Sequence, residues 1–141
     1  MTETLSVGIA LPYPPSINHY WRNVQGRTLI SKRGREYREQ VRRLVLAFGG
    51  TASFGRLPLC VHMLAVMPDR RKRDLDNLTK AVLDALTHAG VWEDDSQIND
   101  LRITRSKQVE KGGSLIVMIT VQQDEACRGC KWANEQMRGE A

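Results

Sequence analysis

The chain has 141 residues, of which 41% are hydrophobic and 26% are charged, and its formal net charge is +5. This length suits one domain with its own core, and no apolar run reaches the roughly 18 residues that a membrane helix needs. The N-terminus also lacks the basic and small-residue features of a signal peptide. We therefore expect a cytoplasmic protein with no membrane contact.

The positive charge lies in the body of the chain. Residues 122–141, the tail, carry three Lys or Arg and four acids, a net −1, which leaves +6 on residues 1–121. We expect residues 1–121 to form one domain and the tail to be a short helix or a disordered segment. A basic body is typical of proteins that bind a polyanion, most often nucleic acid, although many basic proteins bind none.

The first half of the chain predicts a strand, a long loop and a helix. Residues 4–11 alternate loosely and end at a proline, which indicates a strand. Residues 12–28 are rich in Pro, Asn and Gly and predict a loop whose length favours a functional role. A short strand is expected at 28–31. From Lys32 to Phe48 the apolar residues recur at helical spacing, and two glycines then end the helix.

The second half predicts a strand, a helix and a hairpin. Residues 59–66 are nearly all apolar, as in a strand inside a sheet, and residues 74–89 have one apolar helical face. Residues 101–107 alternate, EKGG forms a turn, and residues 114–121 return as the last strand. This order predicts a single α/β (α+β) domain, a mixed β-sheet with two main helices packed on one side.

The most informative stretch, MPDRRKRDLDNLTK, places two aspartates where a loop enters the second helix. One carboxylate there can cap free backbone N–H groups, but capping does not require both Asp74 and Asp76. The alternative is a divalent metal site, because Mg²⁺ binds hard oxygen ligands and relieves repulsion between neighbouring carboxylates. Phosphodiester cleavage also needs cations that hold the phosphate. Four of them stand directly upstream: Arg70, Arg71, Lys72 and Arg73.

Three more acids follow the second helix, and one of them can complete the metal site if the chain turns back there. The residue pattern does not select among Glu93, Asp94 and Asp95. Lys80 has two interpretations of equal weight. It forms an i,i+4 ion-pair ladder with acids on its helix, or it donates to the scissile phosphate or the leaving oxygen.

The N-terminal segment PPSINHYWR combines aromatic side chains with polar and basic ones. Aromatic rings beside arginine suit base stacking and phosphate contact, which makes Asn18 and Arg22 DNA-binding candidates. The same rings, Tyr20 and Trp21, equally suit a loop that is pinned on the core.

Taken together, LPYPPSINHYWR, GRTLIS with EYR, MPDRRKRDLDNLTKAVLDAL and AGVWEDDSQIND resemble the RusA family of Holliday junction resolvases, which occur in bacteria and often in prophages. The likeness covers about residues 11 to 121. It implies an α/β homodimer that binds four-way branched DNA and introduces paired nicks during recombination and repair. It also implies Mg²⁺ as cofactor, which Mn²⁺ can replace, and no small-molecule substrate.

The resemblance also implies which side chains act. Three aspartates and a lysine are catalytic in the family, and they match Asp74, Asp76, Lys80 and Asp95, with the three aspartates as metal ligands. The tail departs from the family pattern. Its Cys127 and Cys130 form a CxxC that could supply half of a zinc site across a dimer, because zinc needs two more ligands. The other interpretations are a variable appendage and a helix that covers an edge.

Two other functions remain open at this point. A metal nuclease for flaps or replication forks would use the same residues. A non-catalytic branched-DNA-binding module would leave the retained Asp–Asp–Lys–Asp set unexplained. The short chain and its basic body argue against a third function, a nucleotide-sugar transferase that uses the DxD motif.

Overall fold

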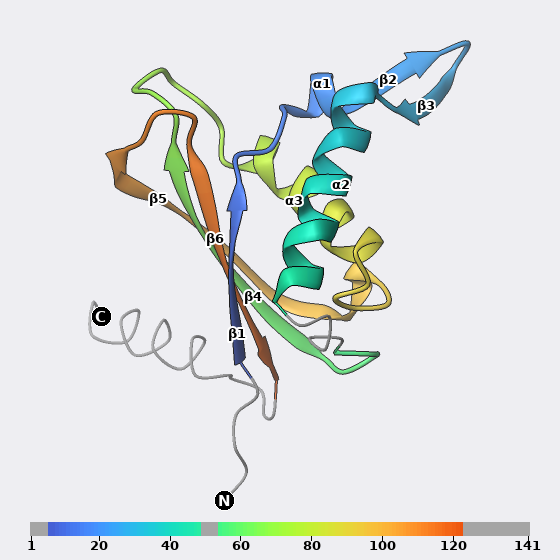
Figure 1. Cartoon of the computed structure of the whole chain (residues 1–141), viewed down its shortest axis with the longest axis vertical. Coiled ribbons are helices and arrows are strands. Elements are labelled where there is room, and N and C mark those ends of the chain that lie inside the picture. Colours follow the sequence, from blue (N-terminus) through green and yellow to red (C-terminus); the bar gives the residue numbers. More distant parts are fainter. Residues whose placement is uncertain (1–5, 49–53, 123–141) are drawn as a thin grey trace, which may run out of the picture.

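The computed structural model describes residues 6–48 and 54–122, and it places two helices on one face of a mixed sheet (Figure 1). The sheet order is β1–β6–β4–β5, with β5 parallel to β4 and the other neighbours antiparallel. The predicted fold class is therefore confirmed. The strands are β1 (Ser6–Pro12), β4 (Leu59–Met67), β5 (Ile98–Val109) and β6 (Ser114–Val121), and the main helices are α2 (Lys32–Ala47) and α3 (Asp76–His88).

The core lies between the sheet and these two helices. Alternate residues of β4, from Leu59 to Met67, are buried on the helix side, as the side-chain period of a strand requires. Helices α2 and α3 bury their apolar faces against them, including Val41 and Val82 at 0% exposure. Cys60 is buried as well. No helix in the described part of the chain is long and apolar enough to cross a membrane.

The prediction of a plain loop over residues 12–28 was wrong. This region holds a one-turn helix, α1 (Ile17–Tyr20), and a hairpin of β2 (Trp21–Val24) and β3 (Arg27–Ile30) that projects from the body (Figure 1). Elements of four residues are too short for a periodic hydrophobic signal. The hairpin closes on Gln25 and Gly26, both with positive φ (50° and 77°), the backbone of a two-residue hairpin turn.

The ends of the other elements differ from the predictions by a few residues. Strand β5 starts at Ile98 after a short 3₁₀ turn, η1 (Asp95–Gln97), and α3 starts at Asp76. The domain boundary after residue 121 stays a prediction. Residues 123–141, which include Cys127 and Cys130, lie outside the described residues.

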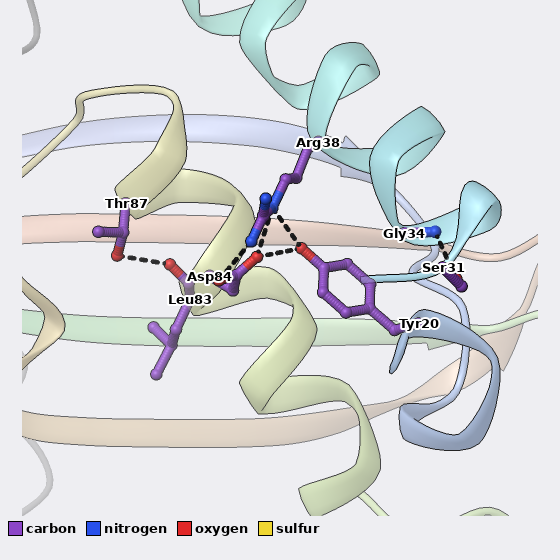
Figure 2. Close-up of polar contacts among 7 residues, drawn as sticks. All are labelled: Tyr20, Ser31, Gly34, Arg38, Leu83, Asp84 and Thr87. Atoms are coloured by element: carbon purple, nitrogen blue, oxygen red, sulfur yellow. Dashed lines mark hydrogen bonds and ion pairs between the residues drawn. The ribbon is translucent and has the colours of Figure 1, made fainter. Parts of the chain in front are cut away.

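A cluster of three side chains joins α1, α2 and α3 (Figure 2). Arg38 of α2 forms a two-pronged pair with Asp84 of α3, with Nε–Oδ2 at 2.8 Å and Nη2–Oδ1 at 3.1 Å. The hydroxyl of Tyr20 donates to the same carboxylate. Burial and this hydrogen bond raise the pKa of Tyr20 well above its ordinary value, so the hydroxyl stays protonated and remains a donor.

The start of α2 holds α1 in place through its backbone. Ser31 caps α2 by accepting from the Gly34 N–H at 3.0 Å, and its hydroxyl donates to the carbonyl of His19. A Cβ at Gly34 would come within 2.5 Å of the Tyr20 carbonyl oxygen. This contact explains a glycine inside a helix, because α1 passes too close for any side chain.

The cluster of Tyr20, Arg38 and Asp84 predicts a measurable coupling. Arg38→Ala should lower the free energy of unfolding by about 1–3 kcal/mol, because it leaves a largely buried carboxylate without its cation. Asp84→Ala should cost a similar amount, and the double variant should cost less than the sum. Urea denaturation followed by circular dichroism measures all three. Arg42→Ala, which removes an exposed pair with Glu39, should change little. Additive effects at Arg38 and Asp84 would contradict the coupling.

Candidate active site

Asp74 and Asp76 stand at the start of α3, where neither carboxylate caps the helix. Both are exposed. The N-cap of α3 is Leu75, and no side chain caps this helix end. Neither aspartate lies within salt-bridge distance of a Lys or Arg in the described ranges 6–48 and 54–122. The capping interpretation is therefore not realised, and both carboxylates are available to an external cation.

The basic run just upstream is balanced by a different acid. Asp69 pairs with Arg73 at 2.9 Å and accepts the backbone N–H of Arg71 at 3.0 Å. These bonds hold the pKa of Asp69 below its usual value. Arg105 of β5 donates to the carbonyl of Arg73 and so ties this loop to the sheet. Arg70 and Lys72 are exposed, and among the described residues neither pairs with a carboxylate.

Lys80 does not form the ion-pair ladder that its spacing allows. Its neighbour Asp84 pairs with Arg38 instead. The ammonium nitrogen of Lys80 lies 5.6 Å from the ring centroid of Trp21, a distance typical of a cation–π contact. Lys80 is exposed and sits one turn after Asp76 on α3. Its charge is therefore positioned close to the Asp74–Asp76 pair.

The aromatic residues of the N-terminal segment pin it to the core. Tyr20 is 0% exposed, and Trp21 packs edge-on against it with ring centroids 4.9 Å apart. Of the two interpretations that the sequence allowed, pinning is the one realised for these rings. Asn18 and Arg22 are exposed, on α1 and β2.

The structure separates the three late acids by their partners. Glu93 pairs with Arg56. Asp94 caps η1, where its Oδ1 accepts the Ser96 N–H at 2.9 Å in a capping box with Gln97. Asp95 is exposed and has no Lys or Arg within salt-bridge distance in the described ranges.

The environment of Asp95 disfavours its charge. Partial burial raises the pKa of its carboxyl, and a hydrogen bond to Asp94 and the charges of Asp94 and Asp84 raise it further. Among Glu93, Asp94 and Asp95, the family likeness thus selects the acid that neither pairs with a cation nor caps a turn. The sequence could not show the pairing of Glu93 with Arg56, which is a tertiary contact, but the capping box of Asp94 and Gln97 is a local pattern that could have singled out Asp94 as a cap.

One chain does not bring Asp95 to the Asp74–Asp76 pair. Asp95 begins η1, which contacts α3, and it is affected by the charge of Asp84, a residue two turns or about 12 Å further along α3 than Asp76. Strand β5 follows Asp95 and starts opposite Leu59, whereas the loop to Asp74 leaves the far end of β4. Within ranges 6–48 and 54–122 no three His, Cys, Asp or Glu side chains gather closely enough to hold a metal ion.

Comparison with known proteins gives one consistent family. The family model described as Endodeoxyribonuclease RusA matches residues 12–120. A crossover junction endodeoxyribonuclease of Enterobacteria phage 82 is 48% identical over 113 residues, which cover 79% of this chain and 92% of that protein. The proteins of the same name from Shigella sonnei (strain Ss046) and Escherichia coli (strain K12) are 47% and 46% identical over the same shares.

The separation of roles among the late acids predicts opposite effects on stability. Asp94→Ala should lower the thermal midpoint, because η1 loses its cap. Asp95→Asn should leave the midpoint unchanged or raise it slightly at pH 7, because it removes a carboxylate whose ionisation is disfavoured in the fold.

Thermal unfolding in EDTA measures both variants. The raised pKa of Asp95 means that its ionisation weakens the fold at any pH above its ordinary pKa of 3.8, so any gain in Asp95→Asn should disappear as the pH falls below that value. A loss in Asp95→Asn as large as that in Asp94→Ala would show that Asp95 has a structural role.

Proposed function

This chain belongs to the RusA family of endodeoxyribonucleases, and we propose that it resolves four-way DNA junctions by paired, metal-dependent nicks during recombination and repair. The observation that carries the proposal is the pair Asp74 and Asp76, which stand exposed and without a cation partner just after a basic loop. The enzyme would act in the cytoplasm, where bacterial DNA lies.

The residues fit a Mg²⁺ cofactor, which Mn²⁺ could replace. The proposed ligands, Asp74, Asp76 and Asp95, are all carboxylates, the hard oxygen donors that Mg²⁺ prefers. None of the three is paired with a Lys or Arg among the described residues. When bound, the cation supplies Lewis-acid polarisation of the phosphate and neutralises negative charge.

The protein's own side chains then hold and orient the DNA. Lys80 would donate to an oxygen of the scissile phosphate or to the leaving oxygen, and the contact with Trp21 limits where its ammonium group can lie. Asn18 and Arg22 would contact the DNA from the N-terminal segment and the hairpin. The backbone would be attracted by the basic loop, Arg70, Arg71, Lys72 and Arg73.

A homodimer would complete the metal site. Since no three His, Cys, Asp or Glu side chains within ranges 6–48 and 54–122 gather closely enough to hold a metal ion, we propose that the partner's Asp95 joins the pair. An isologous contact would form two such sites related by a two-fold axis. A four-way junction has approximate two-fold symmetry, so the two sites would meet strands of the same polarity and produce paired nicks.

The first test is cleavage of a labelled synthetic four-way junction with Mg²⁺. We expect symmetric nicks in the junction and none in a linear duplex of the same sequence. Asp76→Asn should abolish cutting but keep junction affinity within a few-fold, because the DNA is held mainly by cations. Arg70→Ala should instead weaken binding and lower the salt slope of log K by about 1. Junction binding with no nicks under either Mg²⁺ or Mn²⁺ would favour a non-catalytic module.

A mixed dimer tests the shared site. Asp76→Asn and Asp95→Asn subunits, each inactive alone, should regain activity when co-expressed and purified as a heterodimer. If the sites are shared, one site carries both substitutions and the other carries neither, so the heterodimer should nick one strand. Differently tagged subunits allow isolation of the heterodimer, and the two homodimers are the controls. An inactive heterodimer would contradict a site built from two chains.

A further inference from the structure

A surface pocket of about 600 Å³ lies beside Asp74, and none of the roles above uses it. Five segments line it: the chain after β1, helix α1, helix α2, the loop after β4 and the first turn of α3. This volume falls within the range of small-molecule pockets. The side chains that matter below are Tyr13, His19, Arg33, Lys72, Asp74 and Asn77.

The charges of the walls favour an anion. Arg33, Lys72 and Arg73 face a single acid, Asp74, and Arg73 is already paired with Asp69. Arg33 and Lys72 are exposed, and in the described part of the chain neither forms a salt bridge. Two cations in the pocket are therefore available to a phosphate group.

The same pocket offers flat surfaces and one polar edge. The ring of Tyr13 and two prolines form an apolar wall, with Pro14 buried. The imidazole of His19 is held by a hydrogen bond between Nδ1 and the Ser16 hydroxyl at 2.9 Å. Asn77 adds an amide that can donate and accept. Flat rings next to cations are the surfaces that hold a base and its phosphate.

We propose that this pocket holds one nucleotide of the branched DNA, next to the scissile phosphate. The unstacked base would lie between Tyr13 and His19, and its phosphate would meet Arg33 and Lys72. The inference rests on the proposed function, because it takes Asp74 as part of the metal site. It adds a site for the base, which the metal and the basic loop alone do not supply.

The pocket would make cutting depend on DNA structure. A base inside a duplex is stacked and paired, and it must leave the helix to enter a pocket. Leaving costs least where pairing is already disturbed, which is the case at a branch point. Cations that contact the backbone cannot make this distinction, since every phosphate in a duplex is alike to them.

The first experiment follows a fluorescent base in the uncut complex. 2-Aminopurine is placed in turn at each of the three positions on either side of the cut, in a junction bound by the Asp76→Asn protein. We expect its fluorescence to rise several-fold at one position, because unstacking relieves quenching. Adding His19→Ala should remove most of the rise. His88→Ala, an exposed histidine in the last turn of α3 outside the pocket, should leave it unchanged.

The second experiment pairs each variant with an abasic nucleotide at that position. In the otherwise unmodified protein, loss of the base should lower kcat/KM by about tenfold, as expected for one stacked base. In His19→Ala the abasic nucleotide should lower kcat/KM by only about threefold or less, since this variant has already lost the contact between His19 and the base. Arg33→Ala should lower kcat/KM equally for the normal and the abasic junction, because Arg33 contacts the phosphate and not the base. Arg43→Ala, on the same helix but outside the pocket, should affect neither.

The outcomes separate this inference from the proposed function. If the wild-type protein nicks no junction, the proposed function fails. If it nicks junctions and Asp76→Asn does not, but no position shows a fluorescence rise, the pocket holds no base and only this inference fails. An abasic penalty equal in His19→Ala and wild type would overturn it as well, because the base would then contact something else.

Discussion

The carboxylate of Asp84 joins the three segments that surround the candidate site. It receives two hydrogen bonds from Arg38 of α2 and one from Tyr20 of α1. These bonds fix the N-terminal segment against α3, so that Trp21 lies beneath Lys80. They also hold His19 and Tyr13 on one side of the pocket and Asp74 on the other. Substitutions that break the Arg38–Asp84 pair should therefore change the site as well as the stability of the fold.

Seven acids of the described residues, around α3 and η1, fall into two groups by their partners. Asp69, Asp84 and Glu93 are paired with arginines, and Asp94 caps a turn. Asp74, Asp76 and Asp95 have neither kind of partner among the described residues. A carboxylate that pairs with no cation and caps no helix contributes little to stability, so the presence of Asp74 and Asp76 next to a basic loop is best explained by an external cation and its DNA. This difference distinguishes candidate ligands from structural acids without reference to any relative.

The sequence correctly predicted the strands and helices that have a regular spacing of apolar residues. Strand β4 and helices α2 and α3 bury long, regular apolar faces, so their type and approximate limits follow from residue spacing. The hairpin from Trp21 to Ile30 has no such face, and only its second strand was expected, at residues 28–31. The Asp74–Asp76 pair could be singled out because both residues lie on one short segment. The choice among Glu93, Asp94 and Asp95 depends on Arg56 and Gln97, and the distance from Asp95 to the pair depends on the parallel order of β4 and β5. The contact of Arg56 with Glu93 and the strand order are tertiary properties, whereas the capping box of Asp94 and Gln97 is local and could have been recognised in the sequence.

The most direct test of the shared site is to locate bound Mn²⁺ by its anomalous scattering in crystals of the dimer. We expect a peak between Asp74 and Asp76 of one protomer, within coordination distance of the partner's Asp95. A peak held by Asp74 and Asp76 with both copies of Asp95 far away would contradict the proposal that two chains build each metal site.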